Sequence, residues 1–200
     1  MQLRITALSL LVVFTLGGCS VLPRPTPSPR YHDFGPVVPP PATFRASIDI
    51  EGVTAPTWLE RDAIWYRFLD HDPTRLRAYA ENRWIAPPGT LIAQAVRDRL
   101  LDHGSPRYRL RLRLTRFEQD FPSLTRATVV VRIRATLLDR AGRVWAQKWF
   151  QLSAPTTPDV SGAVNGLSTL GEQSAKEITA WAVQCTSSAG SEPRPACGGN

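Results

Sequence analysis

The sequence has little of what enzymes and metal sites require. It contains three histidines and three cysteines in 200 residues, with no CxxC pair and no histidines at the spacing of metal ligands. The GxSxG motif of serine hydrolases and the glycine-rich phosphate loop are also absent, although residues 165–171 (NGLSTLG) place a serine among glycines. These absences exclude the commonest signatures of metal-dependent and nucleophilic catalysis. We therefore expect no metal, no cofactor and no enzymatic activity.

One histidine is flanked by carboxylates. His71 lies between Asp70 and Asp72, in a segment typical of a β-turn. Aspartates are common in turns because their side chains bond to nearby backbone groups. We interpret this trio as a turn, and a catalytic role is the alternative.

The chain also lacks an apolar run of the roughly 20 residues that a membrane-spanning helix needs. Its N-terminal apolar run, residues 5–16 (ITALSLLVVFTL), is shorter and follows a basic start. A short apolar core behind a positive charge is typical of a signal peptide. We expect residues 1–18 to be a signal peptide that is cleaved before Cys19.

The residues at the expected cleavage site carry a specific pattern. Leu16, Gly17, Gly18 and Cys19 resemble the lipobox of bacterial lipoproteins. The resemblance implies that Cys19 is lipidated with acyl chains such as palmitate, which together hold a protein on a membrane better than one chain does. Ser20 stands where an aspartate would favour the inner membrane, so we expect an outer-membrane lipoprotein that faces the periplasm. An ordinary secretory signal with an incidental cysteine is the alternative.

Proline is concentrated after the cysteine. Eight of the 18 prolines lie between Ser20 and Ala42. Such a segment forms neither a helix nor an interior strand and favours extended, polyproline-like chain. The sequence therefore predicts a tether over residues 19–42, between a lipid anchor and a head domain over residues 43–184.

The other two cysteines lie near the C-terminus. Cys185 and Cys197 are 12 positions apart, and disulfides are common in exported proteins. A disulfide between them would close the tail over residues 185–200. Two free thiols on a frayed tail are the alternative.

Hydrophobic periodicity predicts the secondary structure of the head. Helices are expected at residues 89–103, after two prolines, and at residues 159–184, capped by Asp159. Hairpin-length links favour an α+β fold with a mostly antiparallel sheet of about six strands and two helices packed on one face. The strands are expected at residues 43–53, 63–69, 78–85, 107–117, 128–138 and 144–152.

Arginine alternates with apolar residues along two of these strands. Residues 107–117 read RYRLRLRLTRF and residues 128–138 read TVVVRIRATLL. Like charges on neighbouring strands are unfavourable unless something pairs or screens them. A phosphate-bearing lipid or an acidic protein surface would do so, and scattered pairing with Glu118, Asp120 and Asp139 is the alternative. The arginines expected to share the sheet face opposite the helices are Arg109, Arg111, Arg113, Arg132 and Arg134.

The overall charge is basic. The formal net charge is +7, and among 24 basic residues only Lys148 and Lys176 are lysines. Basic charge favours anionic lipid headgroups or acidic partners, whereas the bias toward arginine can also reflect a GC-rich genome. No nucleic-acid partner is expected for an exported protein.

Several segments together resemble the ABC-type transport auxiliary lipoproteins, which include the paraquat-inducible protein C type. The resemblance covers about residues 31–183 and starts with YHDFGP at residues 31–36. It continues through DRAGRVWAQKWF at residues 139–150. The single residues that match family positions are Ile64, Tyr66, Arg67, Trp84, Pro87, Pro88 and Trp181.

The resemblance implies a non-catalytic auxiliary role in the envelope of a Gram-negative bacterium. Its expected partners are a periplasmic mammalian-cell-entry domain protein and the ABC transporter or related membrane protein with which it moves phospholipids or other hydrophobic molecules. The competing hypothesis is an accessory lipoprotein for outer-envelope assembly, which would bind lipopolysaccharide machinery or a cell-wall synthase. Direct phospholipid contact and homo-oligomerisation are open.

Overall fold

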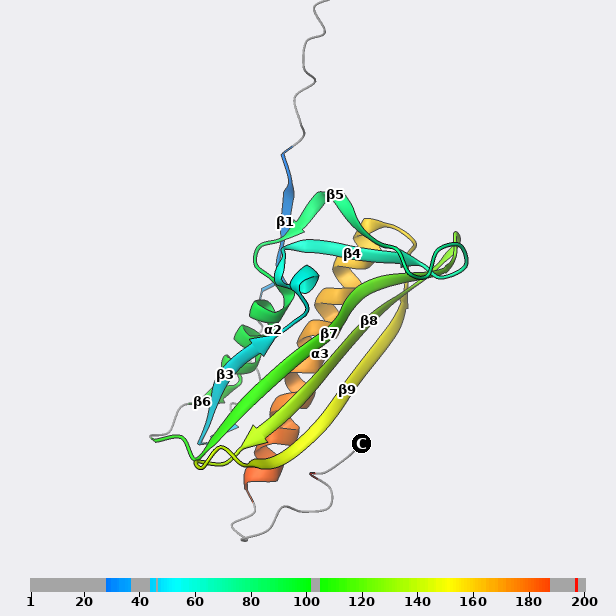
Figure 1. Ribbon diagram of the computed structural model, residues 1–200. Coiled ribbons are helices and arrows are strands. Elements are labelled where there is room, and N and C mark those ends of the chain that lie inside the picture. The colour runs from blue at the N-terminus through cyan, green and yellow to red at the C-terminus, as the bar shows by residue number, and fades with distance from the viewer. Residues whose placement is uncertain (1–27, 37–43, 46, 102–104, 188–196, 198–200) are drawn as a thin grey trace, which may run out of the picture.

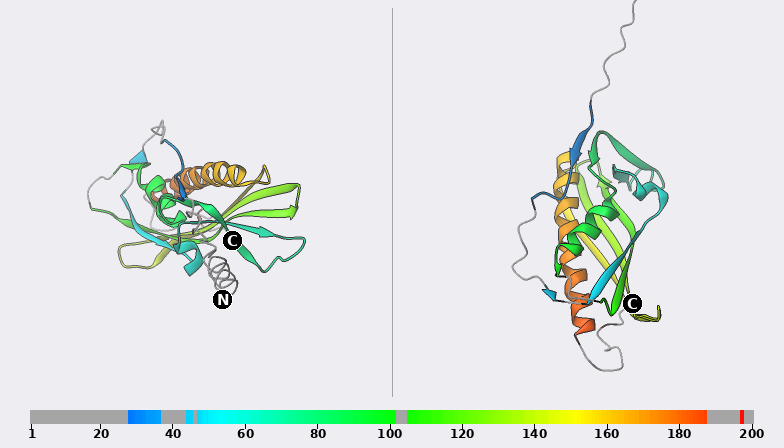
Figure 2. Two further views of the ribbon diagram at one scale, coloured as in Figure 1. Left: turned by 90° about the horizontal axis from the view of Figure 1, so that it is seen from above. Right: turned by 90° about the vertical axis from the view of Figure 1, so that its left-hand side faces the viewer.

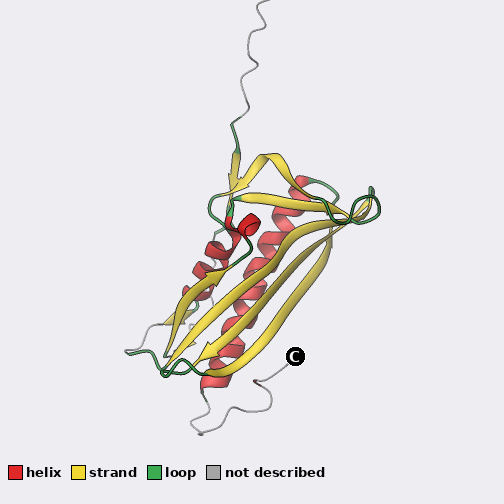
Figure 3. Ribbon diagram, viewed as in Figure 1, coloured by secondary structure: helices red, strands yellow, loops and turns green. Residues whose placement is uncertain are grey.

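The structure is a computed structural model that describes residues 28–36, 44–45, 47–101, 105–187 and 197 (Figure 1). It consists of a seven-stranded sheet with two helices on one side. Figure 2 shows both helices on the same side of the sheet, and Figure 3 shows the strands curving around the longer one. The prediction of an α+β fold is confirmed.

The main sheet is built from strands of very different lengths. Its order is β1-β5-β4-β7-β8-β9, and β3 pairs separately with β7. A 3-10 turn, η2 (Thr57–Glu60), joins β3 to β4. The strands are β1 (Arg30–His32), β3 (Ile48–Thr54), β4 (Ala63–Phe68), β5 (Leu76–Trp84), β7 (Tyr108–Ser123), β8 (Arg126–Leu138) and β9 (Val144–Thr156).

The sheet is mixed, so the expectation of a mostly antiparallel sheet was wrong. The hairpins β4–β5, β7–β8 and β8–β9 are antiparallel. In contrast, β1 is parallel to β5, and both β3 and β4 are parallel to β7. Strand β7 is 16 residues long, so β3 and β4 pair with successive parts of the same edge. Parallel pairing needs a crossover connection, which β5 and α2 (Pro88–Arg97) supply between β4 and β7.

The head begins earlier than the sequence predicted. Strand β1 lies within the expected tether and pairs with β5 over Arg30–His32. Phe34 follows it and packs on Trp84 and Phe117, with ring centroids 5.8 and 6.0 Å apart. An extended segment can be either tether or edge strand, and proline content alone does not distinguish them. The expected signal peptide, Cys19 and the rest of the tether lie outside the described residues.

The first helix is shorter than predicted. Helix α2 ends at Arg97 instead of residue 103. Soon after the helix, β6 (Leu100–Leu101) pairs in parallel with β2 (Phe44–Arg45) to form a separate two-stranded sheet. Ile92 and Val96 of α2 are completely buried against the core. The pairing between β2 and β6 therefore replaces the last turn of the expected helix.

The second helix, α3 (Val160–Thr186), covers the sheet along its length. Asp159 caps it as predicted, because its Oδ1 accepts a hydrogen bond of 2.7 Å from the Gly162 N–H. The buried side of α3 includes Leu167 and Ile178, which meet the apolar side chains of β7 and β8. In the part of the chain that the structure describes, no helix is both long and apolar enough to cross a bilayer.

A disulfide joins Cys185, in the last turn of α3, to Cys197, 12 residues further on. Both cysteines are buried and belong to the core cluster. The bond therefore holds Cys197 against the end of the helix.

Replacing both cysteines by serine should lower the free energy of unfolding by about 2–4 kcal/mol, because the cross-link limits the unfolded chain. Denaturant unfolding of the double variant and of the untreated protein would measure this difference. Reducing the wild-type protein before unfolding serves as the control and should give a similar loss. Equal stability of the oxidised and reduced proteins would contradict a structural role for the bond.

Candidate functional site

The five arginines named from the sequence lie on the sheet face opposite the helices. We call Arg109, Arg111, Arg113, Arg132 and Arg134 the arginine face. Leu110, Leu112 and Leu114 alternate with its β7 members and are completely buried on the helix side. The β7–β8 register sets Arg113 directly opposite Arg134. The structure thus brings the predicted residues together on two adjacent strands.

Two further arginines extend this surface. The β7–β8 register shifts between Leu114 and Arg116, and a bulge there reverses which residues face the helices. Beyond it, Phe117 points into the core, while Arg116 joins the outer side of the sheet. Arg67 reaches the same area from β4, which pairs it with Asp120. In the sequence, the change of apolar phase after Leu114 was the signal that could have revealed the bulge.

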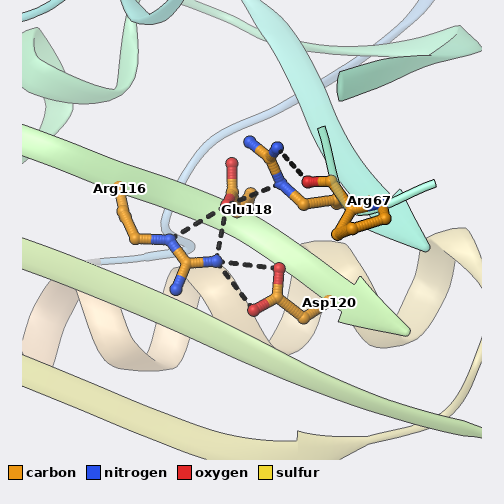
Figure 4. Close-up of polar contacts among 5 residues, drawn as sticks. Arg67, Arg116, Glu118 and Asp120 are labelled. Carbon is orange, nitrogen blue, oxygen red and sulfur yellow. Dashed lines mark hydrogen bonds and ion pairs between the residues drawn. The ribbon is translucent and has the colours of Figure 1, made fainter. Parts of the chain in front are cut away.

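An ion-pair cluster occupies this end of the surface (Figure 4). Arg116 Nη2 lies 2.6 Å from Glu118 Oε1 and 2.7 Å from Asp120 Oδ2. Arg67 Nε approaches Glu118 Oε1 at 3.4 Å, and its Nη1 donates to the Pro73 carbonyl at 2.7 Å. Glu118 and Asp120 are only 3% and 6% exposed. These arginines are therefore already neutralised by buried carboxylates.

Burial has the largest effect on the pKa of one of these acids, Asp120. It raises the pKa of Asp120 above the ordinary value of 3.8, although hydrogen bonds and charge from Arg116 oppose the shift. The folded protein therefore binds the Asp120 proton more tightly than the unfolded chain does. Stability gained from the neutral carboxyl at low pH is lost as the pH rises through the raised pKa.

The substitution Asp120→Asn should consequently favour the folded state more at pH 7 than at pH 3, relative to the wild type. Each pKa unit of elevation corresponds to about 1.4 kcal/mol of this difference. Denaturant unfolding of both proteins across this pH range would measure it. A constant difference, or one that favours asparagine more at pH 3, would contradict the assignment.

The opposite end of the arginine face carries a simpler pair. Arg111 donates to both oxygens of Glu51 on β3, at 2.9 and 3.2 Å. This hydrogen bonding lowers the pKa of Glu51. Because both side chains are exposed, the pair contributes little to stability. It does neutralise one member of the arginine face.

Asp139, the third acid considered as a partner, forms its ion pair with Arg143 and not with a residue of the arginine face. Its Oδ2 lies 2.8 Å from Arg143 Nε in the β8–β9 turn, and its Oδ1 accepts from the Arg143 backbone N–H at 2.9 Å. That backbone hydrogen bond is the main reason why the pKa of Asp139 is lowered. Scattered pairing therefore accounts for Arg111 and the neighbouring Arg116, but not for the middle of the face.

The middle of the face lacks acidic partners. Among the residues that the structure describes, no ion pair involves Arg113, Arg132 or Arg134. The guanidinium carbon of Arg132 lies 4.5 Å from the ring centroid of Trp149, and that of Arg134 lies 5.8 Å away. Arg134 Nη2 also donates to Gln147 Oε1 at 2.6 Å. Two guanidinium groups thus lie near one indole, and neither forms an ion pair with a carboxylate of the described residues.

The residues considered for catalysis lie on separate elements, Ser168 on α3 and His71 on the turn after β4. Ser168, from the NGLSTLG segment, donates to the Asp33 carbonyl at 3.1 Å. His71 lies 3.7 Å from Asp70 on an exposed turn. Within the described ranges, no group of three or more histidine, cysteine or acidic side chains could hold a metal ion.

A cavity of about 800 Å³ lies away from the arginine face, between the β1 segment and α3. Tyr31, Phe34, Ile85 and Val164 contribute to its lining. His32, which also lines it, bonds to Asn82 through Nε2 at 2.8 Å. The cavity therefore combines apolar side chains with a histidine that already has a partner.

Comparison with known proteins identifies a family. The model of the family described as "ABC-type transport auxiliary lipoprotein component" matches residues 34–179. No curated protein matches the sequence. The family match covers nearly all of the described head, including the arginine face, all of α2 and most of α3.

Solved structures share the fold. A Xanthomonas campestris protein of the family DUF330 superposes with a TM-score of 0.63 and 19% sequence identity, covering 79% of this chain and 93% of its own. A second structure, of a protein described only as uncharacterized, gives a TM-score of 0.56 and 16% identity, with coverage of 76% and 97%. At these identities, the likeness establishes the fold alone.

Proposed function

Because the chain belongs to the ABC-type transport auxiliary lipoprotein component family, we propose that it is a non-catalytic docking component of an intermembrane lipid transport system. In this role it engages a periplasmic mammalian-cell-entry domain protein and, through it, an ABC transporter or related membrane partner. The family match over residues 34–179 is the observation that carries the proposal. The family resemblance inferred from the sequence is confirmed by this match.

The anchor determines where the head can act. Family members are lipoproteins of Gram-negative bacteria, so the chain is held at a membrane and faces the periplasm. Acylation of Cys19 is the proposed attachment, and Ser20 after it supports the outer membrane. About ten residues separate Cys19 from β1, which at roughly 3.3–3.6 Å per residue keeps the head within about 40 Å of the bilayer surface.

The arginine face is the proposed docking surface. Arg111, Arg113 and Arg132 are exposed, and the middle of the face has no carboxylate partner among the described residues. A surface of one charge favours an oppositely charged partner and speeds the encounter. An anionic surface on the transport machinery or on lipid would complete this charge pattern.

Mild cross-linking of native envelopes, followed by affinity purification of the lipidated protein and mass spectrometry, tests the proposal. We expect a mammalian-cell-entry domain protein and its membrane partner among the captured proteins. Capture of lipopolysaccharide machinery or a cell-wall synthase in their place would assign the protein to outer-envelope assembly and overturn the transport role.

A further inference from the structure

Three adjacent members of the arginine face lack a carboxylate partner. Arg111 and the neighbouring Arg116 have carboxylates within 3 Å, whereas Arg113, Arg132 and Arg134, like Arg109 at the end of the face, form no ion pair in the described part of the chain. We call Arg113, Arg132 and Arg134 the arginine centre. Closely spaced cations on neighbouring strands repel one another unless an anion lies between them. The centre therefore carries a positive charge that no carboxylate of the described residues neutralises.

The backbone sets these three side chains close together. Arg113 and Arg134 are direct cross-strand neighbours, and Arg132 lies two residues from Arg134 on the same side of β8. Opposite positions bring Cβ atoms to about 5 Å, and residues i and i+2 on one strand lie about 7 Å apart. The three Cβ atoms thus form a small triangle, from which long side chains can reach one compact anion.

Two of the guanidinium groups are held in position. Trp149 supports Arg132 at 4.5 Å and Arg134 at 5.8 Å, and Gln147 accepts a hydrogen bond from Arg134. Such support reduces the side-chain conformational entropy that is lost when a ligand binds. Arg134 Nε is also buried and has no hydrogen-bond partner within the described residues. A buried donor of this kind is normally satisfied by a partner, so an acceptor at the centre would complete its bonding.

The geometry points to a phosphate group as that acceptor: we propose that the arginine centre and Trp149 form a phosphate-binding site. Arginine forks match phosphate oxygens, and a phosphate has enough oxygens to engage three guanidinium groups at once. A carboxylate has only two oxygens and satisfies fewer donors. The phosphate can belong to a phospholipid headgroup or to a free phosphate compound. The inference rests on the proposed docking function and names the ligand of its arginine face.

Titration calorimetry of the full lipidated protein in a neutral detergent at low salt tests the site. The probes are inorganic phosphate, dihexanoylphosphatidylglycerol and acetate. We expect both phosphate probes to bind and acetate to bind more weakly. Tighter binding of the lipid than of inorganic phosphate would identify the source as a headgroup, and equal binding would identify free phosphate.

The double variant Arg113→Gln/Arg132→Gln should reduce phosphate affinity roughly tenfold or more, because it removes two charged hydrogen-bond donors from the site. Arg132→Lys should lose part of the affinity, since lysine keeps the charge without the fork. The matched control Arg97→Gln/Lys176→Gln removes the same charge from exposed positions on the two helices and should leave affinity within about twofold.

Several results would overturn the proposal. The first is an absence of saturable phosphate binding. The second is a phosphate affinity that does not change in the double variant, or that falls equally in the matched control. The third is acetate binding that is as tight as phosphate binding and depends on the same arginines. The last result would indicate an acidic protein as the partner. These outcomes are distinguishable from failure of the proposed function, because the titration uses purified protein and partner capture uses native envelopes.

Discussion

Trp84→Ala is expected to destabilise the head by about 3–5 kcal/mol, the range found for removing a large aromatic side chain from a core. Trp84 is completely buried at the end of β5. Its ring lies 5.6 Å from that of Phe117 and 5.8 Å from that of Phe34. The substitution would therefore leave a cavity where the end of β5 packs against Phe34, which follows β1, and against Phe117 of β7.

Denaturant unfolding followed by circular dichroism would measure this loss. Ile85→Ala is the matched control, because the next residue in the chain is 61% exposed and should change stability by less than about 0.5 kcal/mol. Trp84→Phe should cost much less than alanine, since the buried indole N–H has no partner in the described structure. Similar effects of Trp84→Ala and Ile85→Ala would contradict the packing described here.

Cys19→Ala is expected to release essentially all of the protein from the membrane and to abolish its function. The proposed acyl chains are attached through this cysteine, and each buried methylene contributes about 0.8 kcal/mol to membrane binding. The described head contains no helix that could replace them by crossing the bilayer. Fractionation of envelopes and soluble extract, together with a complementation assay, would measure both effects.

The same variant should keep a folded head, because the head's core starts at β1 and Phe34, well after Cys19. Ser20→Ala is the matched control, and it should stay on the membrane because it leaves the acylation site intact. A soluble Cys19→Ala protein with full activity would show that anchoring is dispensable. Membrane retention of that variant would show that Cys19 is not the point of attachment.

The sequence predicted the elements of the fold better than their arrangement. Strict alternation along residues 107–114 was enough to assign a strand, its buried face and its arginine face. Alternation reports which way side chains point, but it contains no information on the direction of a neighbouring strand. The parallel pairing of β3 and β4 with β7 therefore could not be derived from it.

The site was also predicted in part. The positions of its arginines followed from periodicity, but their partners depend on tertiary contacts. The bulge at residue 115 places Arg116, Glu118 and Asp120 together on the outer side of the sheet, and β4 adds Arg67 from far away in the sequence. Only the folded chain shows that these acids neutralise the end of the surface, while the described residues supply no ion pair at its centre.

Site-specific photo-cross-linking in native envelopes tests the central claim most directly. A photoreactive residue at exposed Gln151, opposite Arg132 in the β8–β9 register, would probe the arginine face. The same residue at exposed Gln173 on α3 is the control for the helix side. We predict an adduct with a mammalian-cell-entry domain protein from position 151 and not from position 173. Adducts with transport partners only from position 173, or none from either position, would contradict docking through the arginine face.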